Sequence, residues 1–472
     1  MGLFIYDLVL LAVFLLGISL FLYSNRKNLK RQGLLILYRT KWGIKLINSV
    51  GRKYDKQLRV LGILSIFTGY ILMICSIYLI GKIVWLYVLY PGIVKQIKVP
   101  PIMPLIPYLP KMFKLNFLPP FYFTYWVIIL AIVAISHEFA HGVFAAHNKI
   151  KIKKTGFGFF PFFFPIFPLA FVELDEKNLE KKKIRKQMEV LSAGTFANII
   201  IAIISSILMI GFFNLAFYPA GITFNDYSYS VVELGTITSI NSIPIENVTY
   251  KALSEFIRGN NFTGIQINGK KYVAAKAFFQ EDGKQYLVLY DDAPAIRENL
   301  TGAITSINGN PIKSWEQLGE ELRKYKPGDT IKITTEKDEG TFEYTLQLGK
   351  DPRNESRAYL GIGYHEYYHS NFLGKLLSKI SSFKKQNIYY KSKIKGGWFI
   401  YNLFWWMVLI GFSVALVNML PVGIFDGGRF FYLTILYLTK SKRKAEKTFR
   451  YVTILFLLIL LLLMVSWVIG IK

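Results

Sequence analysis

Six stretches of about 20 mostly apolar residues set the strongest limit on how this chain can fold. A run of that length is enough to cross the hydrocarbon core of a bilayer as a helix. Hydrophobic residues make up 53% of the 472 residues and charged residues only 18%, which excludes a disordered chain and a coiled coil. The six stretches are Phe4–Tyr23, Val60–Tyr87, Tyr122–Ala146, Glu189–Phe213, Trp398–Leu420 and Tyr451–Gly470.

The positive charge of the chain is unevenly distributed. Lys and Arg number 57 against 30 Asp and Glu, but residues 217–395 hold 20 of the acids and 23 of the basic residues. Elsewhere the basic residues cluster beside the apolar stretches, as in the cytoplasmic loops of membrane proteins. We therefore expect a membrane protein and no nucleic-acid partner. The single cysteine, Cys75, excludes a disulfide scaffold, a zinc ribbon and an iron–sulfur site.

The loop charges also predict an orientation. Residues 24–59, 147–187 and 429–450 carry 11, 10 and seven Lys or Arg, and six alternating helices place all three on one side. By the positive-inside rule that side is cytoplasmic, so residues 217–395 are extracytoplasmic in the cell membrane. One stretch strains this topology, because residues 375–395 carry seven lysines and no acid on the outer side. We interpret it as a basic amphipathic connector at the outer lipid surface.

The extracytoplasmic segment contains an internal repeat. Residues 235–245 match residues 302–312, which lie 67 positions later, and this indicates a duplicated small unit. In the second copy we expect a strand at 303–307, a turn at Gly309, a helix at 315–325 and strands at 331–335 and 342–348. This order resembles PDZ domains, which bind extended peptides by strand addition. The alternative is a generic small β domain, and the first copy matches only around its repeat.

The third apolar stretch contains His137 and His141 with Glu138 between them, in the pattern His-Glu-x-x-His. Positions i and i+4 share one face of a helix, so the two imidazoles can bind one Zn²⁺ while Glu138 takes a proton from the attacking water. Ionisable groups in a membrane span are costly and usually functional. The alternative is a pair of histidines that only caps the inner end of a helix.

A catalytic zinc site needs a third protein ligand. Asp426 is the only acid between Glu366 and Glu446. It follows the fifth stretch, whose last residues include Asn418 and after which Pro421 breaks the helix within the membrane. The third and fifth stretches run in the same direction, so Asp426 approaches the histidines at similar depth. Its alternative role is a helix N-cap.

The fourth stretch carries Gly194 and Asn198 one helical turn apart. Glycine lets two helices approach closely in a membrane, and a buried asparagine can either donate to a substrate carbonyl or bridge helices. The run 157–172 is rich in Phe and contains Pro161, Pro165 and Pro168, which prevent a regular helix. We expect a re-entrant or interfacial hairpin that offers an edge strand to the substrate, with a plain hydrophobic plug as the alternative.

These motifs together resemble the site-2 protease family of intramembrane zinc metalloproteases. The resemblance covers roughly 122–450 and departs from many members at Thr195, where they have proline. It implies Zn²⁺ held by His137, His141 and Asp426, Glu138 as general base, and cleavage of transmembrane helices of other proteins within the bilayer. We expect Gly194, Asn198, Asn418 and Pro421 to support the structure of the site or the bound substrate.

Two other functions remain open at this point. His365 and His369 form a second His-Glu-x-x-His pattern in the extracytoplasmic segment, which a membrane-anchored metalloprotease could use on exported peptides. As a strand this pattern would hold its imidazoles about 13 Å apart, too far to chelate one ion. The third possibility is a PDZ-bearing membrane scaffold without catalysis, against which the intact Glu138 argues.

The sequence thus predicts a polytopic α-helical membrane protein of about six helices with an inserted extracytoplasmic PDZ-like α+β region. Expected partners are the bilayer, transmembrane substrates and a peptide or substrate tail at the insert. The expected divisions are two N-terminal spans with a basic cytoplasmic loop (1–120), the first part of the protease core with its hairpin (121–215), one or two PDZ-like units (216–370), the connector (371–395), and the second part of the core with the last span (396–472).

Overall fold

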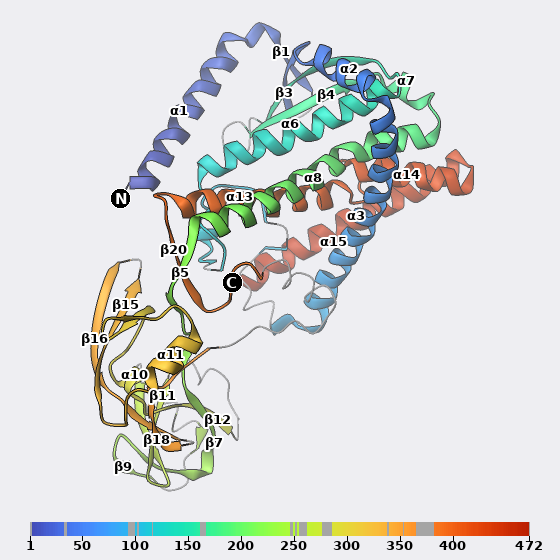
Figure 1. The fold of residues 1–472 in the computed structure, drawn as a ribbon. Helices are drawn as coiled ribbons and strands as arrows, with labels where there is room; N and C mark the ends of the chain where they lie inside the picture. Colours follow the sequence, from blue (N-terminus) through green and yellow to red (C-terminus); the bar gives the residue numbers. More distant parts are fainter. Residues whose placement is uncertain are drawn as a thin grey trace. The chain divides into compact units, whose positions relative to one another are not determined.

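The computed structural model divides the chain into two compact units (Figure 1). The helical unit comprises Met1–Phe212 and Trp398–Lys472, and the inserted unit comprises Phe213–Gly397. The structure describes residues 2–32, 35–92, 100–101, 103–115, 117–160, 167–245, 249–250, 253, 262–275, 286–337, 339–352, 354–364 and 382–471. The second His-Glu-x-x-His pattern, at His365 and His369, lies outside the described residues.

Helices and one small sheet make up the helical unit. Its helices are α1 (Gly2–Ser24), α2 (Ile44–Lys53), α3 (Asp55–Leu89), α5 (Leu109–Met112), α6 (Phe123–His147), α7 (Glu176–Glu180), α8 (Ile184–Ala216), α13 (Gly397–Asn418), α14 (Asp426–Thr439) and α15 (Lys442–Ile471), with a 3₁₀ turn η1 (Arg26–Asn28). Its strands are β1 (Leu29–Gln32), β2 (Leu35–Thr40), β3 (Ile152–Phe160) and β4 (Phe167–Leu174).

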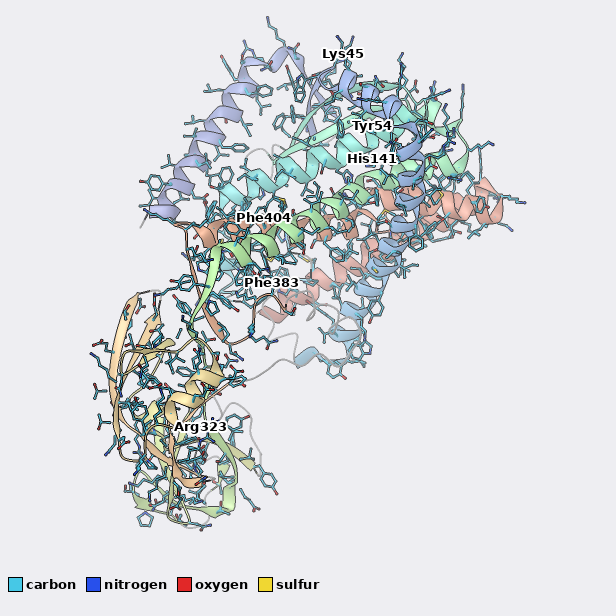
Figure 2. All side chains as sticks on the ribbon, in the orientation of Figure 1. Lys45, Tyr54, His141, Arg323, Phe383 and Phe404 are labelled. Atoms are coloured by element: carbon cyan, nitrogen blue, oxygen red, sulfur yellow. The ribbon has the colours of Figure 1, made fainter. Side chains whose placement is uncertain are left out.

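Among the described residues, six helices are long and apolar enough to cross a membrane: α1, α3, α6, α8, α13 and α15. Side chains project outward along these helices (Figure 2). Many large apolar ones are exposed, among them Leu20, Ile74 and Leu462 at 65%, 66% and 63%. Apolar exposure on this scale is costly in water and is normal against lipid. The predicted multi-pass membrane protein is confirmed.

Helix α6 is the most buried of the spans, with its Phe123, Tyr125 and Ile129 at most 2% exposed. Its first turn has no side-chain cap from its own N-cap residue, Tyr122. Instead Asp7 of α1, only 3% exposed, accepts hydrogen bonds from the backbone N–H of Phe123 at 2.7 Å and of Thr124 at 2.8 Å. The carboxylate thereby satisfies two of the amides that a helix start leaves unpaired, so α1 is fastened to the start of α6.

The predicted hairpin is part of a larger antiparallel sheet. Strands β3 and β4 pair from Ile152 opposite Leu174 to Phe160 opposite Phe167, while residues 161–166 lie outside the described part. Strand β2 pairs with β3, and β1 with β2, which gives the order β1-β2-β3-β4. Strands β1 and β2 lie within 24–59, where a basic cytoplasmic loop was expected, so the sheet is larger than predicted. Strand β4 packs against α6.

The inserted unit is built mainly from antiparallel strands. These are β5 (Phe217–Ile222), β6 (Asp226–Tyr227), β7 (Tyr229–Glu233), β8 (Ile237–Ile240), β9 (Ile243–Pro244), β10 (Phe262–Ile267), β11 (Lys270–Ala275), β12 (Tyr286–Asp291), β13 (Ala303–Ile307), β14 (Asn310–Pro311), β15 (Thr330–Lys337), β16 (Gly340–Gln347), β17 (Gly349–Asp351), β18 (Asn354–Tyr359), β19 (Ile362–Gly363) and β20 (Ile388–Ser392). Short helices are η2 (Leu234–Thr236), α10 (Pro294–Arg297) and α11 (Trp315–Leu322). Two larger sheets run β7-β12-β11-β10-β8-β9 and β16-β15-β13-β5-β20, and β14 pairs with β13.

The internal repeat forms the same hairpin twice. In the first copy Ile240 pairs with Ile243, and in the second Ile307 pairs with Asn310. Both two-residue turns have positive φ at each central residue, at 49° and 67° for Asn241 and Ser242, and at 47° and 83° for Asn308 and Gly309. Such turns match the twist of the flanking strands. The strands and helix predicted for the second copy are confirmed as β13, α11, β15 and β16, which share one hydrophobic core.

Candidate metal centre

The two histidines of the first motif lie side by side on α6. A helix brings residues i and i+4 onto one face, and the Nε2 atoms of His137 and His141 are 3.0 Å apart. Both residues are 8% exposed. Their nearest approach is between two ring nitrogens, which is the arrangement that a shared cation would stabilise.

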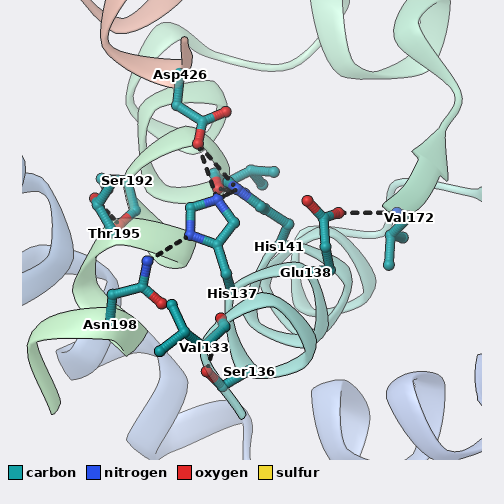
Figure 3. Close-up of polar contacts among 11 residues, drawn as sticks. Val133, Ser136, His137, Glu138, His141, Val172, Ser192, Thr195, Asn198 and Asp426 are labelled. Carbon is teal, nitrogen blue, oxygen red and sulfur yellow. Dashed lines mark hydrogen bonds and ion pairs between the residues drawn. The ribbon is translucent and has the colours of Figure 1, made fainter. Parts of the chain in front are cut away.

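Asp426 reaches the same point from a distant part of the chain. Its Oδ2 atom lies 3.2 Å from Nε2 of His137 and 3.2 Å from Nε2 of His141 (Figure 3). The three possible ligand atoms all lie within 4.8 Å of one another, and no other such group occurs among the described residues. Asp426 is not the N-cap of α14, the alternative role considered for it, because that position is taken by Phe425.

A tight connection between α13 and α14 carries Asp426 to this position. Helix α13 ends at Asn418, Pro421 lies in the following turn, and α14 begins at Asp426. A Cβ at Gly427 would lie 2.5 Å from the carbonyl oxygen of Met419, so the returning chain passes too close for any side chain there. Asn418 and Pro421 therefore belong to the connection that positions the carboxylate.

Backbone and amide groups fix the orientation of both imidazoles. Nδ1 of His141 lies 2.7 Å from the carbonyl oxygen of Val190. A carbonyl oxygen only accepts, so Nδ1 carries the proton and Nε2 keeps its lone pair for a metal. Nδ1 of His137 lies 3.0 Å from the side-chain amide of Asn198, which is fully buried in α8 (Figure 3).

The surroundings of Asn198 indicate that the site fits a metal ion. Its Oδ1 atom is buried and has no hydrogen-bond partner within the described part of the chain. Rotating the carboxamide by half a turn would let Oδ1 accept from Nδ1–H of His137 and leave Nε2 free as a ligand. Partners of this kind are usual around metal-bound histidines. Of the two roles expected for Asn198, the contact seen here is the bridge between helices α8 and α6.

Gly194 makes room for the ligand group. A Cβ at this position would lie 2.5 Å from Nε2 of His137 and closer still to Nε2 of His141. Any larger residue would therefore occupy the space in which the ligand nitrogens converge. Thr195, the departure from the family pattern, is fully buried and donates to the carbonyl oxygen of Ser192 at 2.9 Å, inside its own helix.

Glu138 lies on α6 beside the histidines but faces another element. Its Oε2 atom accepts a hydrogen bond from the backbone N–H of Val172 in β4 at 2.8 Å (Figure 3). It also borders a cavity of about 560 Å³ whose other walls include Phe157, Ala170 and Phe171. Sequence reasoning missed the contacts of Val172 and Val190, because backbone groups take part in them and leave no residue signature.

Two nitrogens and one carboxylate oxygen form a donor set that zinc takes in catalytic sites, where a fourth position stays open. The sequence profile of peptidase family M50 matches residues 125–462, well over half of the chain. The chain belongs to peptidase family M50. The protein is therefore a membrane metallopeptidase, and its resemblance to the site-2 protease family is confirmed.

Two further likenesses accompany the family match. An uncharacterized protein of Methanocaldococcus jannaschii is 33% identical over 316 residues, which cover 64% of this M50 chain and 71% of the relative. The PDZ domain of an SdrC-like protein from Listeria monocytogenes is 27% identical, with a TM-score of 0.14, and the match covers 15% of this chain and 75% of that one.

Substitution of Gly194 by alanine should impair metal binding by this M50 peptidase. The added Cβ forces the imidazoles apart, and we expect zinc affinity to fall by about 10- to 100-fold, the range typical when groups that position metal ligands are changed. Zinc titration of the purified protein measures this. Gly211→Ala on the same helix is the matched control, because a Cβ there meets nothing within 4 Å. Equal zinc affinity in the two variants would contradict the convergence of the ligands at Gly194.

Proposed function

We propose that the protein is a zinc-dependent endopeptidase that cleaves other membrane proteins within or near their transmembrane segments. One observation carries this proposal: His137 and His141 lie on α6, a helix long and apolar enough to cross a membrane, and meet Asp426 of α14 there. Ionisable groups at such a place are expensive and mark function. Membership of family M50, whose members are zinc metalloproteases, supports the same reading.

The roles follow from the chemistry of each side chain. His137, His141 and Asp426 would hold the zinc ion, which when bound acts as a Lewis acid toward the scissile carbonyl. Glu138, next to the ligands and outside their group, would take the proton of the attacking water and pass it to the leaving amine. Gly194 and Asn198 would keep the imidazoles in place, and Asn418 and Pro421 would shape the turn that presents Asp426.

A transmembrane substrate must be unwound before it is cut, because a helix keeps its peptide groups in internal hydrogen bonds. Strand β4 is the outer strand of its sheet, and no described strand pairs with its far edge. An extended segment can bind to such an edge by strand addition. Glu138 contacts that same strand through Val172, so the unwound segment would lie beside the proposed base.

Two substitutions separate the proposed base from the proposed ligands. Glu138→Gln removes the base and no ligand, so cleavage should be lost while zinc stays bound. Asp426→Asn removes a charged ligand, so both zinc binding and cleavage should fall. Zinc content and cleavage of a membrane-embedded substrate are measured on the same purified samples. Full activity in Glu138→Gln would end the proposal for this site.

The second His-Glu-x-x-His pattern provides the control for the location of the site. His137→Ala with His141→Ala should lose the zinc and all activity, whereas His365→Ala with His369→Ala should keep both. The opposite result would favour a metalloprotease that acts on exported peptides. Zinc binding without any cleavage by the unaltered protein would favour a membrane scaffold.

The inserted unit would select substrates by binding a peptide or substrate tail. Strand addition to a PDZ-like unit supports this, since it recognises extended peptides. Strand β20 pairs with β5, so a clean deletion has to span 217–392, with a flexible linker in its place. We expect zinc content to persist and the preference between full-length and trimmed substrates to disappear. Unchanged preference would remove the insert from substrate selection.

We also propose that the metal centre opens toward the cytoplasm and that the insert is extracytoplasmic, as the loop charges indicate. Lys271 in the insert and Lys442 at the start of α15 are both exposed. In a Cys75→Ala background, Lys271→Cys should react with an impermeant maleimide on intact cells. Lys442→Cys should react only after the cells are permeabilised. The reverse labelling would invert the topology.

A further inference from the structure

The hydrogen bond between Glu138 and Val172 occupies the edge of β4 that a substrate strand would use. Val172 lies opposite Thr155 of β3, and the next pair is Phe171 with Gly156. Residues of an antiparallel pair alternate between those that bond across to the neighbour and those that face away. Because the Val172 N–H donates to Glu138 at 2.8 Å, Val172 is one of the residues whose backbone groups face away from β3.

An added strand has to bond to these outward-facing groups. The outward groups of β4 near Glu138 belong to Val172 and, two residues earlier, to Ala170. A substrate carbonyl that pairs at Val172 needs the same N–H that Glu138 now holds. Strand addition at this point and the Glu138 hydrogen bond therefore compete for a single donor.

We propose that Val172 restrains Glu138 until a substrate strand binds, so that loading of β4 releases the carboxylate for catalysis. The inference rests on the proposed function of Glu138 as the base. Figure 3 shows the Glu138 carboxylate turned toward Val172. The adjoining cavity of about 560 Å³ gives the released side chain room to change its conformation. Val172 is thus a positioning residue that acts through its backbone amide.

The amide can be removed without breaking the sheet. Proline lacks an N–H and is tolerated on an edge strand where that N–H faces outward. Val172→Pro therefore removes the donor to Glu138 and no bond to β3. Ala170→Pro is the matched control, because its outward N–H is lost while the Glu138 bond remains.

The test compares two substrates on full-length protein in lipid nanodiscs. One is a membrane-embedded helix, and the other is a tetrapeptide too short to pair along β4. In Val172→Pro we expect tetrapeptide hydrolysis to rise by about two- to tenfold, the range set by one hydrogen bond, and zinc content to stay unchanged. The membrane substrate should show a higher KM, because it loses a pairing donor. Ala170→Pro should raise that KM without any gain on the tetrapeptide. A fall on both substrates in Val172→Pro, or no change on either, would overturn the proposal.

A second measurement does not depend on a proline. Glu138→Ala and Glu138→Gln both lack the proposed base, but only the glutamine can still accept from Val172. We expect an extended ten-residue apolar peptide to bind Glu138→Ala about two- to tenfold more tightly than Glu138→Gln. Equal affinities would rule out competition for the amide. Cleavage by Glu138→Gln would instead count against the proposed function itself, so the two failures are distinguishable.

Discussion

Polar side chains inside an apolar helical bundle have to find partners among themselves, because water is scarce there. The candidate metal centre meets most of this requirement through contacts among its own side chains and the neighbouring backbone. The two imidazoles and the carboxylate of Asp426 face one another, and the outer nitrogens of the rings reach Val190 and Asn198. Each contact fixes the distance between two helices, so the packing of α6, α8 and α14 is set by the chemistry at their meeting point.

The sheet beside α6 adds a second constraint. A free strand edge invites pairing with another chain, and most proteins cover or charge such edges. Here the edge of β4 meets the side chain of Glu138, which satisfies one of its amides. The contact links the two parts of the unit that a substrate would have to engage, the strand that could hold it extended and the carboxylate that could act on it.

Much of this arrangement could be predicted from the sequence, and the limits have physical causes. The spacing of His137 and His141 defines one helix face, and apolar length defines the spans, because both depend on local geometry alone. The contact of Asn198 with His137 depends on how two helices rotate about their axes, which spacing does not specify. The strands at 29–40 were missed because basic residues surround them, and their pairing with β3 joins segments more than a hundred residues apart.

The cap that Asp7 places on α6 has a consequence for how the protein is assembled. Asp7 and the amides it accepts from are 116 and 117 residues apart, so α1 is synthesised long before its partner exists. During that interval the carboxylate has to stay hydrated, which its place near the end of α1 permits, since an unpaired acid at the centre of a bilayer costs about 2.5–3.5 kcal/mol. Helix α1 therefore cannot make this contact until the start of α6 has been synthesised, and its docking then completes the start of the helix that carries the candidate metal ligands.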